Sequence, residues 1–101
     1  MVALAANGTM AFTANGGSDS ISVIELGQGR LVKSIKVPRQ PEAITSNKAG
    51  SEIWVGSNDE GLVSVISIDD GSILAQWSGF EWPYRILLNN DEKYTLVSDL
   101  R

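Results

Sequence analysis

The residue types best suited to ligand binding lie in one short stretch near the end of the chain. It reads Phe80-Glu81-Trp82-Pro83-Tyr84-Arg85. Aromatic rings beside an arginine could stack on a sugar, a quinone or a nucleobase, because both groups offer flat contact surfaces. The alternative interpretation is structural, with Phe80 and Trp82 filling the space between packed sheets. We take Trp82, Tyr84 and Arg85 as candidate ligand-binding residues.

The acidic loop Asn58-Asp59-Glu60 is a second candidate for chemistry. Carboxylate and amide oxygens are hard ligands that can hold Ca²⁺. A calcium site needs about six to eight oxygens at fixed spacing, and the EF-hand pattern is missing, so a solvated turn is the alternative. We therefore predict no metal site and keep Asp59 and Glu60 as candidate ligand contacts.

Composition argues against most catalytic constellations. The chain has no histidine and no cysteine, which removes the usual base for a serine nucleophile and all thiolate chemistry. The net charge of −4, with 8 lysines and arginines, makes duplex nucleic acid an improbable partner, because neutralising phosphates requires many cations. No apolar run is long enough to span a membrane. The residues point to no particular cofactor, and a non-catalytic role is favoured over an enzyme.

The elements that must position these loops follow from an internal repeat. Phe12, Trp54 and Leu96 each stand 42 positions after the last, and the run Ile21-Ser22-Val23-Ile24 recurs 42 positions later as Val63-Ser64-Val65-Ile66. A fixed period of this length is typical of solenoids, propellers and repeat arrays. A β-sandwich whose strands recur by chance is the alternative.

Each repeat is predicted to fold as four antiparallel strands. The run Leu62–Ile68 carries apolar residues on both faces, as in a sheet covered on both sides by neighbours. The predicted strands cover about 2–6, 10–15, 20–26 and 30–37, then 42–46, 52–57, 62–68 and 72–78, then 84–88 and 94–99. No helix is expected. The fold class is therefore all-β, a β-propeller fragment of four-stranded antiparallel blades.

The number of repeats bears on possible partners. The units cover about 1–42, 43–84 and a truncated 85–101. Repeat folds generally need three or more units before stacking buries enough surface. We therefore expect residues 1–101 to be a partial propeller that packs on its remaining blades or on further copies of itself.

One end of the expected sheets gathers the candidate residues. In a four-stranded unit, the loops between units and those between the second and third strands lie at the same end, where ligands usually enter. These loops are 16–19, 38–41, 58–61 and 79–83. Arg39 and Gln40, in the loop between the first two units, complete the candidate set. A small molecule or a protein could bind at this end.

Specific motifs add a family resemblance. Pro41-Glu42-Ala43-Ile44 is followed by Trp54-Val55-Gly56-Ser57, then Leu62-Val63-Ser64-Val65-Ile66 and Asp70-Gly71. This order resembles the YVTN repeat family of β-propellers, and Phe12-Thr13-Ala14-Asn15 resembles its signature tetrad. Ser57 and Asp99 depart from the asparagine that ends that tetrad. The WD-repeat signature is missing.

The resemblance implies a propeller of about seven blades around a channel, usually in a bacterial or archaeal protein that is often exported, which favours a periplasmic or secreted location. Relatives include surface-layer proteins, nucleic-acid-binding periplasmic proteins, lactonases, and subunits of quinoprotein and haem enzymes. We predict a non-catalytic binding or interaction scaffold. The alternative is part of a propeller enzyme or enzyme subunit, either a metal-dependent lactonase or a quinoprotein or haem dehydrogenase.

Overall fold

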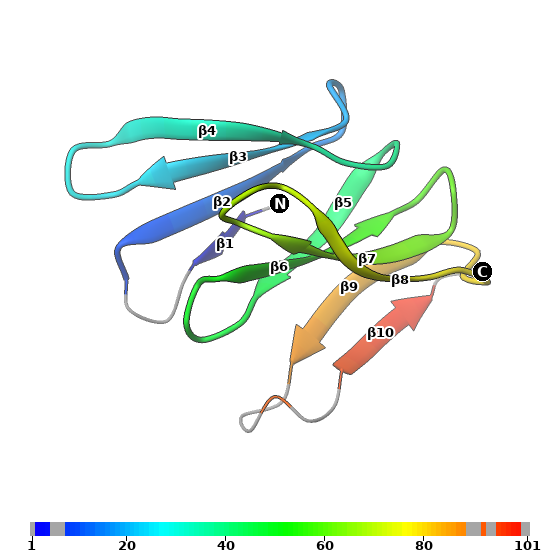
Figure 1. Ribbon diagram of the computed structural model, residues 1–101. Coiled ribbons are helices and arrows are strands. Elements are labelled where there is room, and N and C mark those ends of the chain that lie inside the picture. The colour runs from blue at the N-terminus through cyan, green and yellow to red at the C-terminus, as the bar shows by residue number, and fades with distance from the viewer. Residues whose placement is uncertain (1, 5–7, 89–91, 93–94, 100–101) are drawn as a thin grey trace.

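The computed structural model describes residues 2–4, 8–88, 92 and 95–99. All regular elements in these ranges are β-strands, which confirms the all-β class, and they form three antiparallel sheets (Figure 1). Within the described ranges there is no helix capable of crossing a membrane.

The first sheet contains β1 (Val2–Leu4), β2 (Met10–Asn15), β3 (Ser20–Glu25) and β4 (Arg30–Lys36). The second contains β5 (Pro41–Ser46), β6 (Glu52–Ser57), β7 (Leu62–Ser67) and β8 (Ile73–Trp77), and the third contains β9 (Pro83–Leu88) and β10 (Thr95–Asp99).

In each sheet, strands that are consecutive in the sequence pair antiparallel. The registers of the first two sheets match: Phe12 lies opposite Val23, and Trp54, 42 positions later, lies opposite Val65. On the inner side, Phe12 lies opposite Ala3. Residues that stand 42 apart in the sequence thus occupy the same place in successive sheets.

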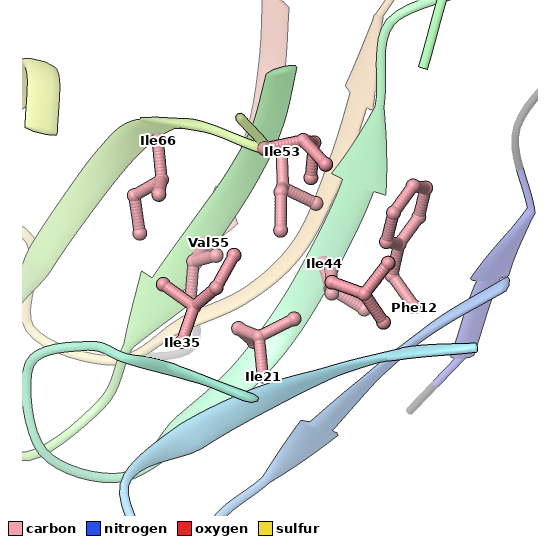
Figure 2. Close-up of a cluster of buried hydrophobic side chains, with 9 residues drawn as sticks. Phe12, Ile21, Ile35, Ile44, Ile53, Val55 and Ile66 are labelled. Carbon is pink, nitrogen blue, oxygen red and sulfur yellow. The ribbon is translucent and has the colours of Figure 1, made fainter. Parts of the chain in front are cut away.

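The main core lies between the first and second sheets. Figure 2 shows Phe12, Ile21 and Ile35 of the first sheet pointing toward apolar side chains of the second. Branched apolar side chains dominate this layer, as expected where two pleated faces interdigitate. Its buried members are Phe12, Ile21, Val23, Ile35, Ile44, Ile53, Val55, Ile66 and Ile68.

A second core lies between the second and third sheets. Ala43 and Val63 pack there against Ile86 of β9, with Trp54, Phe80 and Val97 half-buried around them. Because Ile66 of β7 belongs to the first core and Val63 to the second, the two faces of β7 serve different layers. This is the arrangement predicted from the apolar residues on both faces of Leu62–Ile68.

Side chains at equivalent positions of the repeat differ in exposure from one sheet to the next. Phe12 is 0% exposed, Trp54 is half-buried, and Leu96, at the same position in the third sheet, is 63% exposed. The outer strands behave alike: Ile35 of β4 is 6% exposed, whereas Trp77, its equivalent in β8, is 47% exposed. The side chain at a given repeat position is therefore buried by the sheet that follows it.

Lys33 connects the two large sheets at their outer edge. Its Nζ donates hydrogen bonds to the carbonyl oxygens of Ile68 (2.7 Å) and Asp69 (2.9 Å). The ammonium group of Lys33 thus binds the carbonyl oxygens of the turn that follows β7. The equivalent position in the second sheet is Ala75, which cannot form such a bridge.

Candidate functional site

Hydrogen bonds link each candidate loop to the next, and between the first two the Gln40 amide donates to the Asp19 side chain. The Val37 amide donates to the Asp19 carbonyl (3.0 Å), and the Asn58 amide donates to the Gln40 carbonyl (3.0 Å). In the next repeat the Phe80 amide donates to the Gly61 carbonyl (3.3 Å). We call these joined loops, residues 16–19, 38–41, 58–61 and 79–83, the loop face.

Gln40 is held in place by its backbone. Its φ of +59° lies in the left-handed region, which costs a residue with a Cβ atom about 1–2 kcal/mol. Its amide donates to Asp19 Oδ1 (3.0 Å) and its carbonyl accepts from Asn58, which offsets that cost. The Gln40 side chain is exposed and remains available for a ligand.

Arg39 and Glu60 form an ion pair across two loops. Arg39 Nε lies 3.7 Å from Glu60 Oε1, and both side chains are exposed. An exposed pair of this kind contributes about 0–1 kcal/mol to stability. Its value to the site is that a guanidinium and a carboxylate stand together at the surface, where a polar ligand or a protein could reach both.

A single repeat position secures the loops between sheets. Ser57 Oγ donates to the Pro38 carbonyl (3.1 Å). Asp99, 42 positions later, accepts hydrogen bonds from the amides of Glu81 (3.0 Å to Oδ2) and Trp82 (2.6 Å to Oδ1). Both residues depart from the asparagine of the signature tetrad, and the structure shows that both bind the preceding loop. The departures are visible in the sequence, but the sequence alone does not indicate this role.

Some residues of the aromatic stretch 80–85 pack against the core, and others lie at the surface. Phe80 is half-buried and packs against the second core, which agrees with the structural alternative for that ring. Trp82 is half-buried beside Asp99, and Arg85 is exposed on β9 opposite Ser98. The side chain of Tyr84 lies outside the described residues, although its backbone belongs to β9. Trp82 is thus the aromatic residue that this loop presents, whereas Arg85 lies on β9, on the same face of the third sheet as Leu87.

The acidic loop uses its first residue internally. Asn58 is buried, and its Nδ2 donates to Glu42 Oε2 (2.7 Å) on β5. Asp59 and Glu60 are exposed, and Glu60 is paired with Arg39. Within the ranges that the structure describes, no three His, Cys, Asp or Glu side chains gather as a metal site would require.

In the turn between β7 and β8, hydrogen bonds alter the pKa of Asp70. The Ser72 amide donates to Asp70 Oδ1 (2.9 Å), and this bond, with a further one from the Ser72 side chain, lowers the pKa of Asp70. A lowered pKa favours the folded state above the ordinary pKa and loses that effect as pH falls. Asp70 is fully exposed, so it acts locally on the turn.

Removing the Asp99 carboxylate should destabilise the protein measurably. Asp99→Ala leaves the amides of Glu81 and Trp82 without their acceptor, so we expect the free energy of unfolding to fall by about 1–3 kcal/mol in a denaturant titration. Asp99→Asn keeps one side-chain carbonyl oxygen and should lose less. Equal losses for the two variants would show that the amide contacts are unimportant.

Comparison with known proteins identifies the architecture. No protein-family model matches the sequence, and no curated protein matches it. A solved structure titled Kuenenia stuttgartiensis Hydrazine Synthase, a protein that contains a β-propeller, is similar with a TM-score of 0.92 over 97% of this chain. The fold is β-propeller-like. Sequence identity to that structure is 21%, so the likeness concerns the fold alone, and this chain spans 28% of the length of that chain.

The propeller-like fold accounts for the contacts between sheets. The innermost strands β1, β5 and β9 are neighbours in space, with β5 touching both others, as strands around a common axis must be. The resemblance to the YVTN family is not tested by this comparison and stays a prediction.

Proposed function

We propose that this chain is a non-catalytic interaction scaffold, a section of a YVTN-type β-propeller whose four-stranded sheets are blades of 42 residues. Its units are about 1–42, 43–84 and 85–101. The observation that supports this best is the exposure of one repeat position, from 0% at Phe12 to 63% at Leu96. The face that carries this position is covered in the first sheet, partly covered in the second and open in the third.

The open face of the third sheet carries two exposed leucines, beside the polar pair Arg85 and Ser98. Leu87 and Leu96 lie opposite each other on β9 and β10 and are 60% and 63% exposed. The equivalent pair in the second sheet is Thr45 and Trp54. Two adjacent exposed leucines on a flat sheet favour association, because covering them removes apolar area from water at about 25 cal/mol per Å². We propose that a further blade packs on this face.

A second copy of the chain could supply a complementary surface. The far face of the first sheet carries Ala11, Thr13, Ile24 and Leu26, each 42 positions before Ile53, Val55, Ile66 and Ile68. Those four later residues form the face that the second sheet packs against the first. Head-to-tail stacking of two copies would therefore repeat a contact that the chain already makes.

The loop face is the proposed site for a ligand. Its candidate contacts are Arg39, Gln40, Asp59, Glu60, Trp82, Tyr84 and Arg85. The ion pair of Arg39 with Glu60 and the ring of Trp82 lie in loops of the same kind, and Arg85 lies on β9 just after the last of them. A small polar molecule or a protein is the proposed class of ligand, and the net charge of −4 makes duplex nucleic acid an improbable one.

Association in solution tests the scaffold. Light scattering over a range of protein concentrations should show oligomers, and the double variant Leu87→Lys with Leu96→Lys should shift the chain to monomer. Leu31→Lys with Ile73→Lys is the matched control, because these residues are also exposed and lie on the outer strands β4 and β8. A wild-type chain that stays monomeric throughout, or equal effects of both double variants, would refute the docking face.

A further inference from the structure

The turn between β7 and β8 contains a chemically reactive pair of residues, Asp70 and Gly71. Glycine follows aspartate at no other position of the sequence. Such a pair can rearrange its own backbone, because a glycine has no side chain to keep its amide nitrogen away from the neighbouring carboxyl group. Asp70 is fully exposed, and a hollow of about 330 Å³ lies beside both residues. Water therefore reaches the pair.

The rearrangement is an isomerisation that needs only water. The Gly71 nitrogen attacks Cγ of the protonated Asp70 carboxyl group and gives up its proton, while the Cγ–O bond breaks and water leaves. The product is a cyclic succinimide. Water then opens the ring at the main-chain carbonyl, so that the chain continues through Cγ and contains isoaspartate. One water leaves and one returns, so no oxidant or reductant is required.

Hydrogen bonds of the folded turn oppose ring closure at both reacting groups. The Gly71 amide donates to the Ser67 carbonyl oxygen (2.9 Å), which holds the proton that the reaction must remove. The Ser72 amide donates to Asp70 Oδ1 (2.9 Å), and the Ser72 side chain bonds to the same carboxylate. These bonds lower the pKa of Asp70, so less of the reactive protonated acid is present. Unfolding removes all of them.

The first sheet has the equivalent turn with a different side chain. Gln28 and Gly29 stand 42 positions before Asp70 and Gly71, and both glycines have a positive φ, of +63° and +72°. The glycine is therefore required by the turn in both sheets. A glutamine side chain is one carbon longer and closes the corresponding ring far more slowly. The reactive pair thus arises in the second sheet alone of these two.

The reactive turn also connects the first two sheets. Lys33 Nζ of β4 donates to the Asp69 carbonyl oxygen (2.9 Å). A Cβ atom added to Gly71 would lie 3.3 Å from Ile35 Cγ2, so the backbone of the turn lies close to β4 there as well. Asp70 stands between these two contacts in the sequence. Isoaspartate adds one atom to the backbone at this point, and the two contacts cannot both keep their present geometry.

We propose that the pair Asp70 and Gly71 is a site of spontaneous isomerisation, that the hydrogen bonds from Ser72 keep it slow in the folded protein, and that conversion loosens the contact between β4 and the second sheet. This inference goes beyond the proposed function and is independent of it. It involves only the first two sheets, each of which has its four strands within the described residues.

Incubating the full chain at mildly acidic pH, followed by peptide mass spectrometry with electron-transfer fragmentation, measures isoaspartate at position 70. We expect slow conversion in the folded protein, faster conversion in urea, and none for Asp70→Glu. Ser72→Ala should raise the rate severalfold in the folded state, because it removes one bond to the carboxylate, and should match the wild type in urea. Ser34→Ala is the matched control, since Ser34 lines the same hollow but is not a hydrogen-bond partner of Asp70, and it should leave the rate unchanged.

Two comparisons can overturn the protection by the turn. Equal rates for the folded chain and the chain in urea would show that the fold does not slow the reaction. An unchanged rate for folded Ser72→Ala, or a rise that persists in urea, would show that Ser72 does not act through the folded turn. Asp99→Ala, which should destabilise the chain at the loop face, tests for general unfolding. It should leave the rate near that of the wild type, and a rise equal to that of Ser72→Ala would overturn the assignment.

Hydrogen exchange tests the effect of the product on the fold. In chains converted to isoaspartate and purified, the amides of β4 should exchange faster than in the unconverted protein, because the turn no longer holds that strand in the same way. The amides of β6, which pairs with strands on both sides, are the internal reference and should be unchanged. Equal exchange of β4 in both forms would overturn the loosening.

Discussion

Replacing Phe12 with alanine should lower the free energy of unfolding by about 3–5 kcal/mol. Phe12 is 0% exposed and lies at the centre of the core between the first two sheets (Figure 2). Removing the ring loses the free energy gained by transferring it from water to the core. It also leaves a cavity between the two sheets, which can close only partly because hydrogen bonds hold their backbones. Equilibrium denaturation in urea, followed by tryptophan fluorescence, measures the change.

The repeat supplies matched controls at the same strand position. Leu96→Ala removes a side chain that is 63% exposed and should cost less than about 1 kcal/mol. Trp54→Ala should fall between the two, because Trp54 is half-buried and stacks on an exposed ring. Equal losses at positions 12 and 96 would contradict the exposure gradient.

Replacing Gly61 with alanine should be the most damaging change on the loop face. Gly61 has a φ of +62°, which a Cβ atom disfavours by about 1–2 kcal/mol. An added Cβ would also clash with the carbonyl oxygen of Phe80, which belongs to the backbone and cannot rotate away. Relief requires moving the loop that the Gly61 carbonyl holds through the Phe80 amide. We expect a total loss of about 2–4 kcal/mol.

Gly29→Ala separates the two causes of that loss. Gly29 has a φ of +63°, and an added Cβ there would meet no atom within 4 Å. Its variant should lose only the conformational part, about 1 kcal/mol, in the same denaturant measurement. If the free energy of unfolding falls equally in the two glycine variants, the close contact between Gly61 and Phe80 does not contribute to the loss.

Local chemistry in the sequence was enough to predict the strands. Runs of valine and isoleucine bounded by glycine, aspartate and asparagine predict strands and turns, and the observed β3, β6 and β7 lie within or coincide with the predicted ranges. Register follows from the same pattern, because a slip by one residue would exchange the two faces of each strand. Apolar residues on both faces of Leu62–Ile68 likewise predicted layers on both sides of the second sheet.

The candidate site was predicted only in outline. The four loops were expected at one end, because antiparallel connections alternate between the ends of a sheet, and hydrogen bonds do join them. The pairing of Arg39 with Glu60 and the contact of Asp99 with residues 81 and 82 were not predicted. Both connect residues about 20 positions apart whose side-chain directions depend on loop conformation. A 42-residue comparison of Ser57 with Asp99 was the one signal that could have indicated the second contact.

The sequence by itself determined which residues form strands, which positions are equivalent, and that neighbouring sheets stack through apolar faces, because strand propensity, turn chemistry and alternation act over a few residues. The tertiary structure alone decided which equivalent residues are covered. Phe12 and Leu96 share a position in the repeat, yet one is buried and the other exposed, since burial depends on the sheet that packs against a face. The bridge from Lys33 and the open face at Leu87 follow from that same difference between neighbours.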